Sequence, residues 1–145
     1  MIRLGISVEG KTERLFVNKV LRPHLLAYEV DTTAIDIGGN VSLDKIRGVL
    51  PKLPSDFSQV STMYDFYRFT RRGDRDVAAL EAAISELTNG AEPERLLPYV
   101  QQYEFEALLF AVPEQTVEWL EGGTTDLKTM QQAVRQCGSP EKVND

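Results

Sequence analysis

Apolar and polar residues alternate at the start of the chain with the period of a β-strand. Apolar side chains occupy every second position at Ile2, Leu4, Ile6 and Val8. This alternation predicts a strand that ends at Glu9-Gly10. Between residues 12 and 28 the apolar positions recur instead at helical spacing. We predict a helix there with Thr12 as its N-cap, which kinks or ends near Arg22 because the following Pro23 lacks an N–H donor.

The same succession of strand and helix signals continues to the end of the chain. Further strands are predicted at residues 30–37, 59–65 and 96–101. Further helices are predicted at residues 42–50, 74 or 76 to 87, 104–111, 113–120 and 126–136. We expect Pro51 and Pro54 to stop the helix at 42–50. Asn89-Gly90 should end the helix that reaches residue 87, and Gly138 should end the last helix.

This alternation predicts an α/β fold, with a mainly parallel four-stranded sheet flanked by helices. Residues 1–145 are expected to form a single domain, since no linker or repeat divides the chain. In such sheets ligands bind beyond the carboxyl ends of the strands, near the point where the strand order reverses. Candidate chemistry is therefore sought in the residues that follow each strand.

Composition restricts the choice of partners. The net charge is −6, so binding of nucleic acid would need a local basic patch or bound metal ions. A single cysteine, Cys137, excludes an internal disulfide and is compatible with a reducing compartment. No apolar run approaches the roughly 20 residues of a membrane span, and no signal peptide is evident. We expect a soluble cytoplasmic protein without membrane contact, as a monomer or a homodimer.

The stretch GISVEGKT, residues 5–12, fits the Walker A pattern of a phosphate-binding loop. The alternation of Ile6, Ser7 and Val8 nevertheless favours a strand, and β-branched residues are poor choices for a curled loop. Glu9 would also repel a bound phosphate by roughly 4 kcal/mol at an effective dielectric near 20. We favour Glu9 as an acid at the strand tip and Lys11 as its neighbouring phosphate contact, and keep a nucleotide-binding loop as an alternative.

Other acids follow the later strands. Asp65 ends the third predicted strand, and Glu104 and Glu106 open the helix after the fourth. Glu106 shares a helical turn with Leu109 and Phe110, so we expect its side chain to turn inward. Carboxylates gathered at one sheet edge suit Mg²⁺ or Mn²⁺, which can activate water and polarise a phosphodiester. Glu9, Asp65 and Glu106, with Glu104 as an additional ligand, are the candidate metal-binding acids.

Residues 66–75, FYRFTRRGDR, are the one strongly basic segment of the chain. Guanidinium groups match the geometry of phosphate oxygens, and this segment directly follows Asp65. We therefore expect a nucleic-acid-binding role for its four arginines, Arg68, Arg71, Arg72 and Arg75.

Three motifs together resemble a known family. SVEGKTE after the first strand, MYDFY at the third and PYVQQYEFEALLF at the fourth are similar to the Toprim-related bacterial family known as domain of unknown function 4276. The resemblance covers nearly the whole chain and implies a Toprim-like, Rossmann-like fold with an acidic Mg²⁺ site. Glu9 then matches the Toprim glutamate, and Asp65 the first acid of an Asp-x-Asp motif. Tyr67 replaces the second acid of that motif.

The resemblance implies a Mg²⁺-dependent nuclease or nuclease subunit that hydrolyses DNA or RNA phosphodiesters, with Glu9, Asp65 and Glu106 as catalytic acids. Relatives are often encoded beside ATPases, in what look like phage-defence or genome-maintenance loci. A second interpretation is therefore a catalytically degenerate binding module that regulates a partner ATPase. Relatives usually continue with a further basic segment, so the chain is compatible with a C-terminally truncated member.

Overall fold

The structure is a computed structural model that describes residues 1–88 and 93–143. The chain divides into two compact units, residues 1–101 and residues 102–145. Every strand of the described chain belongs to the first unit. The second unit is helical in its described part.

A parallel sheet forms the centre of the first unit. Its strands are β1 (Ile2–Val8), β2 (Val30–Asp36), β3 (Gln59–Asp65), β4 (Leu96–Leu97) and β5 (Val100–Gln101). The order is β2-β1-β3-β4, and β5 continues along β3 beyond β4. All pairings within the sheet are parallel. The predicted α/β class and parallel sheet are thus confirmed. The third predicted strand has the predicted bounds, and the first ends at Val8, directly before the predicted Glu9-Gly10.

The expected count of four strands is wrong, since the described sheet has five. The predicted fourth strand, residues 96–101, is divided at Pro98, which has no N–H to donate to β3. The side chain of Thr62 takes over the pairing at this break. Its Oγ1 accepts from Tyr99 N at 2.8 Å and donates to Tyr99 O at 2.9 Å. The segment 96–101 is therefore hydrogen-bonded to β3 on both sides of Pro98.

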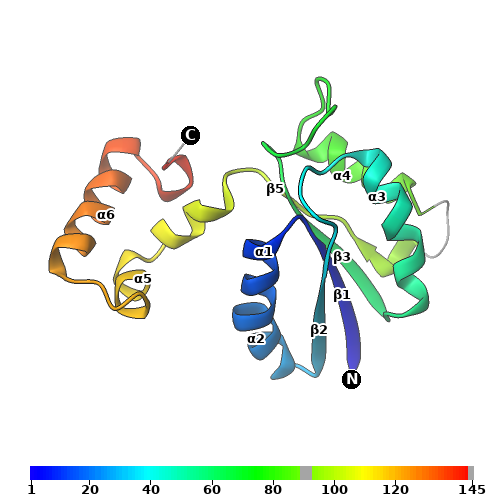
Figure 1. Cartoon of the computed structure of the whole chain (residues 1–145), viewed down its shortest axis with the longest axis horizontal. Coiled ribbons are helices and arrows are strands. Elements are labelled where there is room, and N and C mark those ends of the chain that lie inside the picture. The colour runs from blue at the N-terminus through cyan, green and yellow to red at the C-terminus, as the bar shows by residue number, and fades with distance from the viewer. Residues whose placement is uncertain (89–92, 144–145) are drawn as a thin grey trace. The chain divides into compact units, whose positions relative to one another are not determined.

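Helices cover both faces of this sheet (Figure 1). On one face lie α1 (Lys11–Phe16), a π-helical segment (Val17–Leu21) and α2 (Arg22–Leu26). On the other face lie α3 (Leu43–Val49), a 3-10 segment (Leu50–Ser55) and α4 (Val77–Glu86), and a short 3-10 turn (Pro93–Arg95) precedes β4.

The expected N-cap of the first helix is wrong, and the expected end near Arg22 is replaced by a change of helical winding. Its N-cap is Gly10, not Thr12, because the chain turns directly after Glu9 and the extended backbone of Gly10 lets the helix begin at Lys11. Pro23 neither ends nor breaks the helical segment. A π-turn precedes it, in which Arg22 N donates to Val17 O five residues earlier, so that Pro23 falls in the first turn of α2, where proline is tolerated.

The helices on the other face begin where the sequence predicts. The Ser42 hydroxyl accepts from Lys45 N at 3.2 Å and caps α3, and Asp76 Oδ1 accepts from Ala79 N at 2.8 Å and caps α4. Pro51 and Pro54 end the α-helix but not the helical path, which continues as the 3-10 segment. Asn89 and Gly90, the expected end of the next helix, lie outside the described residues.

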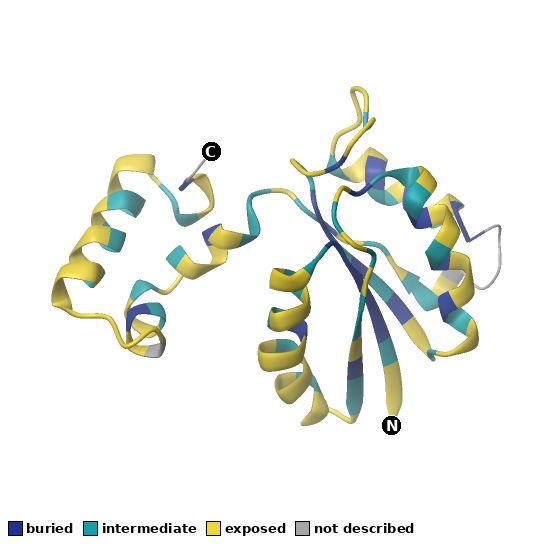
Figure 2. Ribbon diagram, viewed as in Figure 1, coloured by how far each residue is buried: buried dark blue, intermediate teal, exposed yellow. Residues whose placement is uncertain are grey.

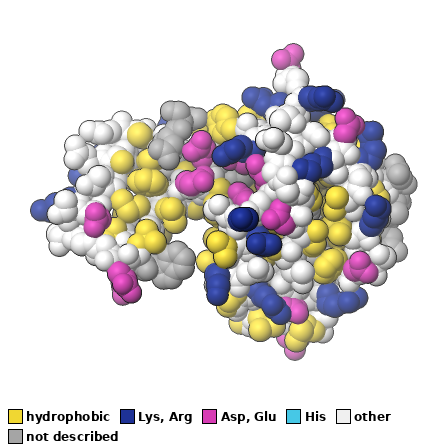
Figure 3. Space-filling view, in the orientation of Figure 1, with side chains coloured by type: hydrophobic (Ala, Val, Ile, Leu, Met, Phe, Trp, Pro, Cys, Tyr) yellow, Lys and Arg dark blue, Asp and Glu magenta, His cyan; other side chains and the backbone are white. Residues whose placement is uncertain are grey.

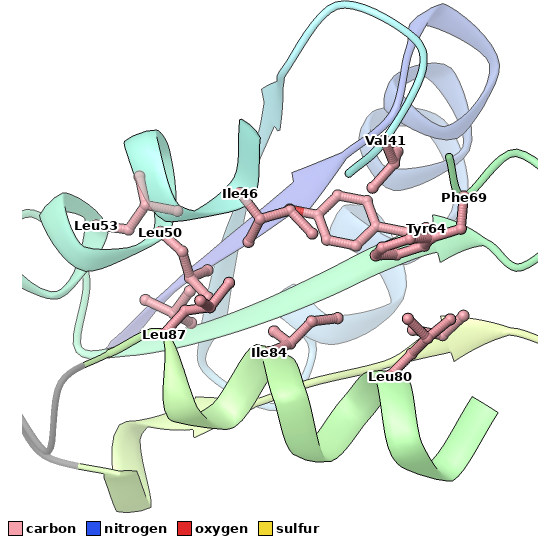
Figure 4. Close-up of a cluster of buried hydrophobic side chains, with 11 residues drawn as sticks. Val41, Ile46, Leu50, Leu53, Tyr64, Phe69, Leu80, Ile84 and Leu87 are labelled. Atoms are coloured by element: carbon pink, nitrogen blue, oxygen red, sulfur yellow. The ribbon is translucent and has the colours of Figure 1, made fainter. Parts of the chain in front are cut away.

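The hydrophobic core of the first unit has two unequal parts. The larger lies under α3 and α4 and includes Ile46, Tyr64, Leu80 and Ile84 (Figure 4). The smaller lies under the α1–α2 segment and contains the buried residues Ile6, Val8 and Val17. Figure 2 shows that the middle of the central strands is buried. The sheet is therefore a rigid support for the residues that follow its strands.

The second unit begins with a 3-10 helix (Phe105–Phe110) in place of the α-helix expected at residues 104–111. It continues with α5 (Pro113–Trp119), α6 (Thr124–Cys137) and a 3-10 turn (Pro140–Lys142). Gly138 ends α6 in the left-handed conformation, with φ of 86°, as predicted. Within residues 1–88 and 93–143, no helix combines the length and apolar character needed to span a bilayer.

Candidate functional site

The strand order reverses between β1 and β3. From β1 the chain crosses outward to β2 on one side, and from β3 it crosses to β4 on the other. Glu9 follows the last residue of β1 and Asp65 is the last residue of β3, where Val8 pairs with Met63. The two acids therefore lie on adjacent strands at the carboxyl edge, at the position where doubly wound sheets bind ligands.

The GISVEGKT stretch does not fold as a phosphate-binding loop. Residues 5–8 belong to β1, and Gly5 pairs with Thr33 on one side and Val60 on the other. The backbone of these residues is thus engaged in the sheet and does not curl around an anion. The Gly5 position is occupied by a glycine for a packing reason, since an added Cβ would lie 2.6 Å from Cδ2 of the Phe57 ring.

Glu9 is buried, with 8% of its surface exposed. Burial raises the pKa of its carboxyl group above the usual value, and the charges of Glu13 and Asp65 raise it further. The charge of Arg68 and a hydrogen bond from the Asp65 backbone lower this pKa in part. Among the described atoms, Oε2 of Glu9 is buried without a hydrogen-bond partner. Burial of a carboxylate oxygen without a partner destabilises the folded protein unless a ligand or cation approaches it.

Glu13 is a further acid that acts on Glu9 and was not among the predicted site residues. Its position in the first turn of α1, four residues after Glu9, is the signal that would have indicated it. A carboxylate there also has the ordinary role of meeting the positive end of a helix. Its charge nevertheless adds to the negative potential at Glu9.

Asp65 is equally buried, at 7% exposure. Its Oδ1 accepts from Tyr67 N at 2.7 Å, and its carbonyl oxygen accepts from Arg68 N at 3.2 Å. This turn orients the carboxylate immediately after the strand. The result is a pair of buried acids from two adjacent strands, each fixed by backbone contacts.

Two loops border this acid pair. The loop after β2 is tied to β1, because Gly39 N donates to Glu9 O at 2.7 Å. The basic segment at 66–75, the green loop at the top of Figure 1, is tied in turn to that loop. Val41 pairs with Phe69, and Thr70 N donates to Val41 O at 2.7 Å. Hydrogen bonds thus connect the two loops to each other and to the carboxyl edge of the sheet.

The arginines of the 66–75 segment lie mostly at the surface. Arg68, Arg71 and Arg75 are exposed, whereas Arg72 is half-buried with its Cζ 4.2 Å from the centroid of the Phe66 ring. Figure 3 shows Lys and Arg side chains gathered at the top of the first unit, over this loop. Lys11, the first residue of α1, is exposed as well.

Within the first unit the structure brings together Glu9 and Asp65, whereas Glu104 and Glu106 belong to the second unit. Glu106 is exposed, and the expectation that it turns inward is wrong. The segment is a 3-10 helix with three residues per turn, and this tighter winding buries Ala107 instead. Glu104 precedes the helix and is half-buried.

The two buried acids fit a water-rich divalent cation. Mg²⁺ usually takes one or two protein carboxylates and keeps several waters, and the unpartnered Oε2 of Glu9 suits such a ligand. Over residues 1–88 and 93–143, no group of three or more His, Cys, Asp or Glu side chains is placed to hold a metal. A third protein ligand from Glu104 or Glu106 stays a prediction.

Fold and site together define a class: a doubly wound parallel α/β domain with an acid pair at its switch point. The comparison with family models gives the particular family. The model described as domain of unknown function (DUF4276) matches residues 8–145, and the chain belongs to this family. No curated protein and no solved structure matches the chain.

Proposed function

We propose that the protein is a Toprim-like, metal-dependent nuclease or nuclease subunit that hydrolyses nucleic-acid phosphodiesters. The observation that carries the proposal is the buried pair Glu9 and Asp65 at the strand-order reversal, with one Glu9 oxygen lacking a partner. A bound Mg²⁺ or Mn²⁺ would supply activation of water and polarisation of the phosphodiester. Glu9 and Asp65 would hold this ion.

The remaining groups of the edge suit an anionic substrate. The charge of Arg68 partly offsets the rise in the pKa of Glu9, and Arg68 lies in the turn that its backbone N–H closes on the carbonyl oxygen of Asp65. Guanidinium groups bind phosphate oxygens in a bidentate manner. Arg68 is therefore assigned to a phosphate next to the metal, and the exposed Arg71, Arg75 and Lys11 to phosphates further along the strand.

The test measures cleavage of circular plasmid and of single-stranded DNA and RNA with Mg²⁺ or Mn²⁺. Glu9→Gln and Asp65→Asn should each lower the rate by at least about 100-fold, because each removes a metal ligand. Glu86→Gln and Asp56→Asn are matched controls on exposed acids and should cleave like the wild type. Equal cleavage by all five proteins would assign the activity to another site or a contaminant.

Metal binding provides a second measurement that does not depend on activity. Titration with Mn²⁺, followed by the electron paramagnetic resonance signal of the free ion, should show a site that Glu9→Gln and Asp65→Asn weaken. Glu106→Gln tests the third ligand: unchanged Mn²⁺ affinity would remove Glu106 from the site. Mn²⁺ affinity that is the same in wild type, Glu9→Gln and Asp65→Asn would overturn the proposal.

A further inference from the structure

Two aromatic residues follow Asp65 directly. Phe66 and Tyr67 form an edge-to-face pair with ring centroids 5.6 Å apart and an interplanar angle of 77°. Phe66 is half-buried, but 50% of the Tyr67 surface is exposed. An aromatic residue is thus presented to solvent two positions after a candidate metal ligand.

The backbone of this pair is fixed to the sheet and to the site. Phe66 N donates to Gln101 O of β5 at 2.9 Å, and Tyr67 N donates to the Asp65 carboxylate at 2.7 Å. The guanidinium group of Arg72 lies over the Phe66 ring, with Cζ 4.2 Å from its centroid. The Tyr67 ring therefore extends from an ordered support rather than from a loose loop.

The charge around Phe66 and Tyr67 indicates which class of ligand binds there. Residues 66–75 contain four arginines and one aspartate, whereas the chain as a whole has a net charge of −6. Basic groups interleaved with an exposed aromatic ring are the combination that binds single-stranded nucleic acid, in which unpaired bases stack on side chains. In a duplex both faces of each base are already covered by its neighbours, so the ring gains no stacking partner there.

We propose that the 66–75 loop binds a single-stranded segment of nucleic acid, with one unpaired base stacked on Tyr67 and the flanking phosphates on Arg68 and Arg71. This assignment rests on the proposed function, because it takes the strand to be the substrate of the acid pair. It makes single-stranded regions the preferred substrate class. Tyr67 is a specificity-determining residue in this arrangement.

The experiment measures binding in the absence of cleavage. Fluorescence anisotropy is recorded in a chelating buffer with three labelled probes: a short oligothymidylate, an abasic strand of equal length, and a duplex of equal length. Tyr67→Ala should weaken binding of oligothymidylate by about tenfold, the loss expected for one stacked base. Tyr67→Phe should restore it, since the ring is kept.

Two further variants separate stacking from charge. Tyr28→Ala removes a similarly exposed aromatic residue of the first unit, 67% exposed, and should bind all probes like the wild type. Arg71→Ala should weaken oligothymidylate and abasic strand by equal factors, because it contacts phosphate only. Circular dichroism verifies that each variant is folded.

The inference is overturned if Tyr67→Ala binds oligothymidylate as tightly as the wild type, or loses equal affinity for the oligothymidylate and abasic probes. Its failure is distinguishable from that of the proposed function. Metal-dependent cleavage that requires Glu9 and Asp65 but not Tyr67 would support the nuclease and reject the stacking role of Tyr67. Base-dependent binding through Tyr67 without any cleavage would support the binding site and reject the nuclease.

Discussion

The two faces of the sheet are packed very differently. Among the described residues, eleven buried hydrophobic side chains lie under α3 and α4, contributed by helices, strands and the loops that contain Val41 and Phe69. The opposite face, under the α1–α2 segment, holds three, with only partly buried neighbours around them. Both faces support the same acid pair, since Glu9 follows β1 and Asp65 ends β3. The difference suggests that the stability of the site comes mainly from the α3–α4 face.

Matched truncations on the two faces should give the largest difference. Leu80→Ala removes a fully buried side chain from α4 and should lower the free energy of unfolding by about 2–5 kcal/mol. Leu21→Ala removes a partly buried side chain on the other face and should cost less than about 2 kcal/mol. Urea unfolding monitored by circular dichroism measures both. Equal costs would contradict the proposed difference between the faces.

Gly5 tests how tightly the α3–α4 face is filled. Gly5→Ala places a Cβ 2.6 Å from the Phe57 ring, which packs against the larger core, and should cost about 1–3 kcal/mol. Gly48→Ala is the control: nothing lies within 4 Å of its added Cβ, and it lies in α3, so it should stabilise by about 0.5–1 kcal/mol. A double variant with Phe57→Leu should recover part of the Gly5→Ala loss. Urea unfolding should show that Gly5→Ala lowers the free energy of unfolding and that Gly48→Ala raises it. A change of the same sign in both variants would contradict the close packing at Gly5.

The smallest expected effect concerns alkaline pH. Burial raises the pKa of Tyr64 to about 12, although its hydroxyl donates to Ser7 Oγ at 2.6 Å. The folded protein therefore holds the phenol proton at pH values where the unfolded chain, with a tyrosine pKa near 10, has lost it. The stabilisation is complete below pH 10 and is lost as the pH rises toward 12, with a decrease of about 1.4 kcal/mol by pH 11.

Comparison with Tyr64→Phe isolates this contribution. The variant should be less stable at neutral pH, because Ser7 loses its partner, but its stability should decrease less between pH 10 and 11. Chemical unfolding at a series of pH values provides the curves. Parallel curves of stability against pH for the two proteins would show that Tyr64 titrates normally and that water reaches the α3–α4 face.

Local sequence signals predicted the elements that carry the site. β3 has its expected bounds, and β1 ends one residue before the expected Glu9-Gly10, because their apolar and polar residues alternate with the period of the strand they form. The parallel direction of the strands then follows from the helix between successive strands, and it places Glu9 and Asp65 at the same edge of the sheet. The adjacency of β1 and β3, and with it that of the two acids, was not predicted by the alternation and is set by the tertiary strand order.

The errors occur where something other than the spacing of apolar residues sets the backbone. Pro23 was tolerated because a π-turn moved it into the first turn of α2, and Pro98 divided a strand whose ends β3 still pairs. Glu106 faces outward because its segment adopted a 3-10 rather than an α-helical winding. None of these choices is encoded in the spacing of apolar residues alone.

The contact between Val41 and Phe69 divides the basic segment into two parts with different freedom to change in evolution. Residues from Asp65 to Thr70 are held at both ends, by β3 and by the pairing of Phe69 and Thr70 with Val41. An inserted or deleted residue there would shift Tyr67 and Arg68 relative to Glu9. After Thr70 the chain only has to reach Asp76, the cap of α4. Length variation among relatives should therefore be concentrated between Arg71 and Arg75.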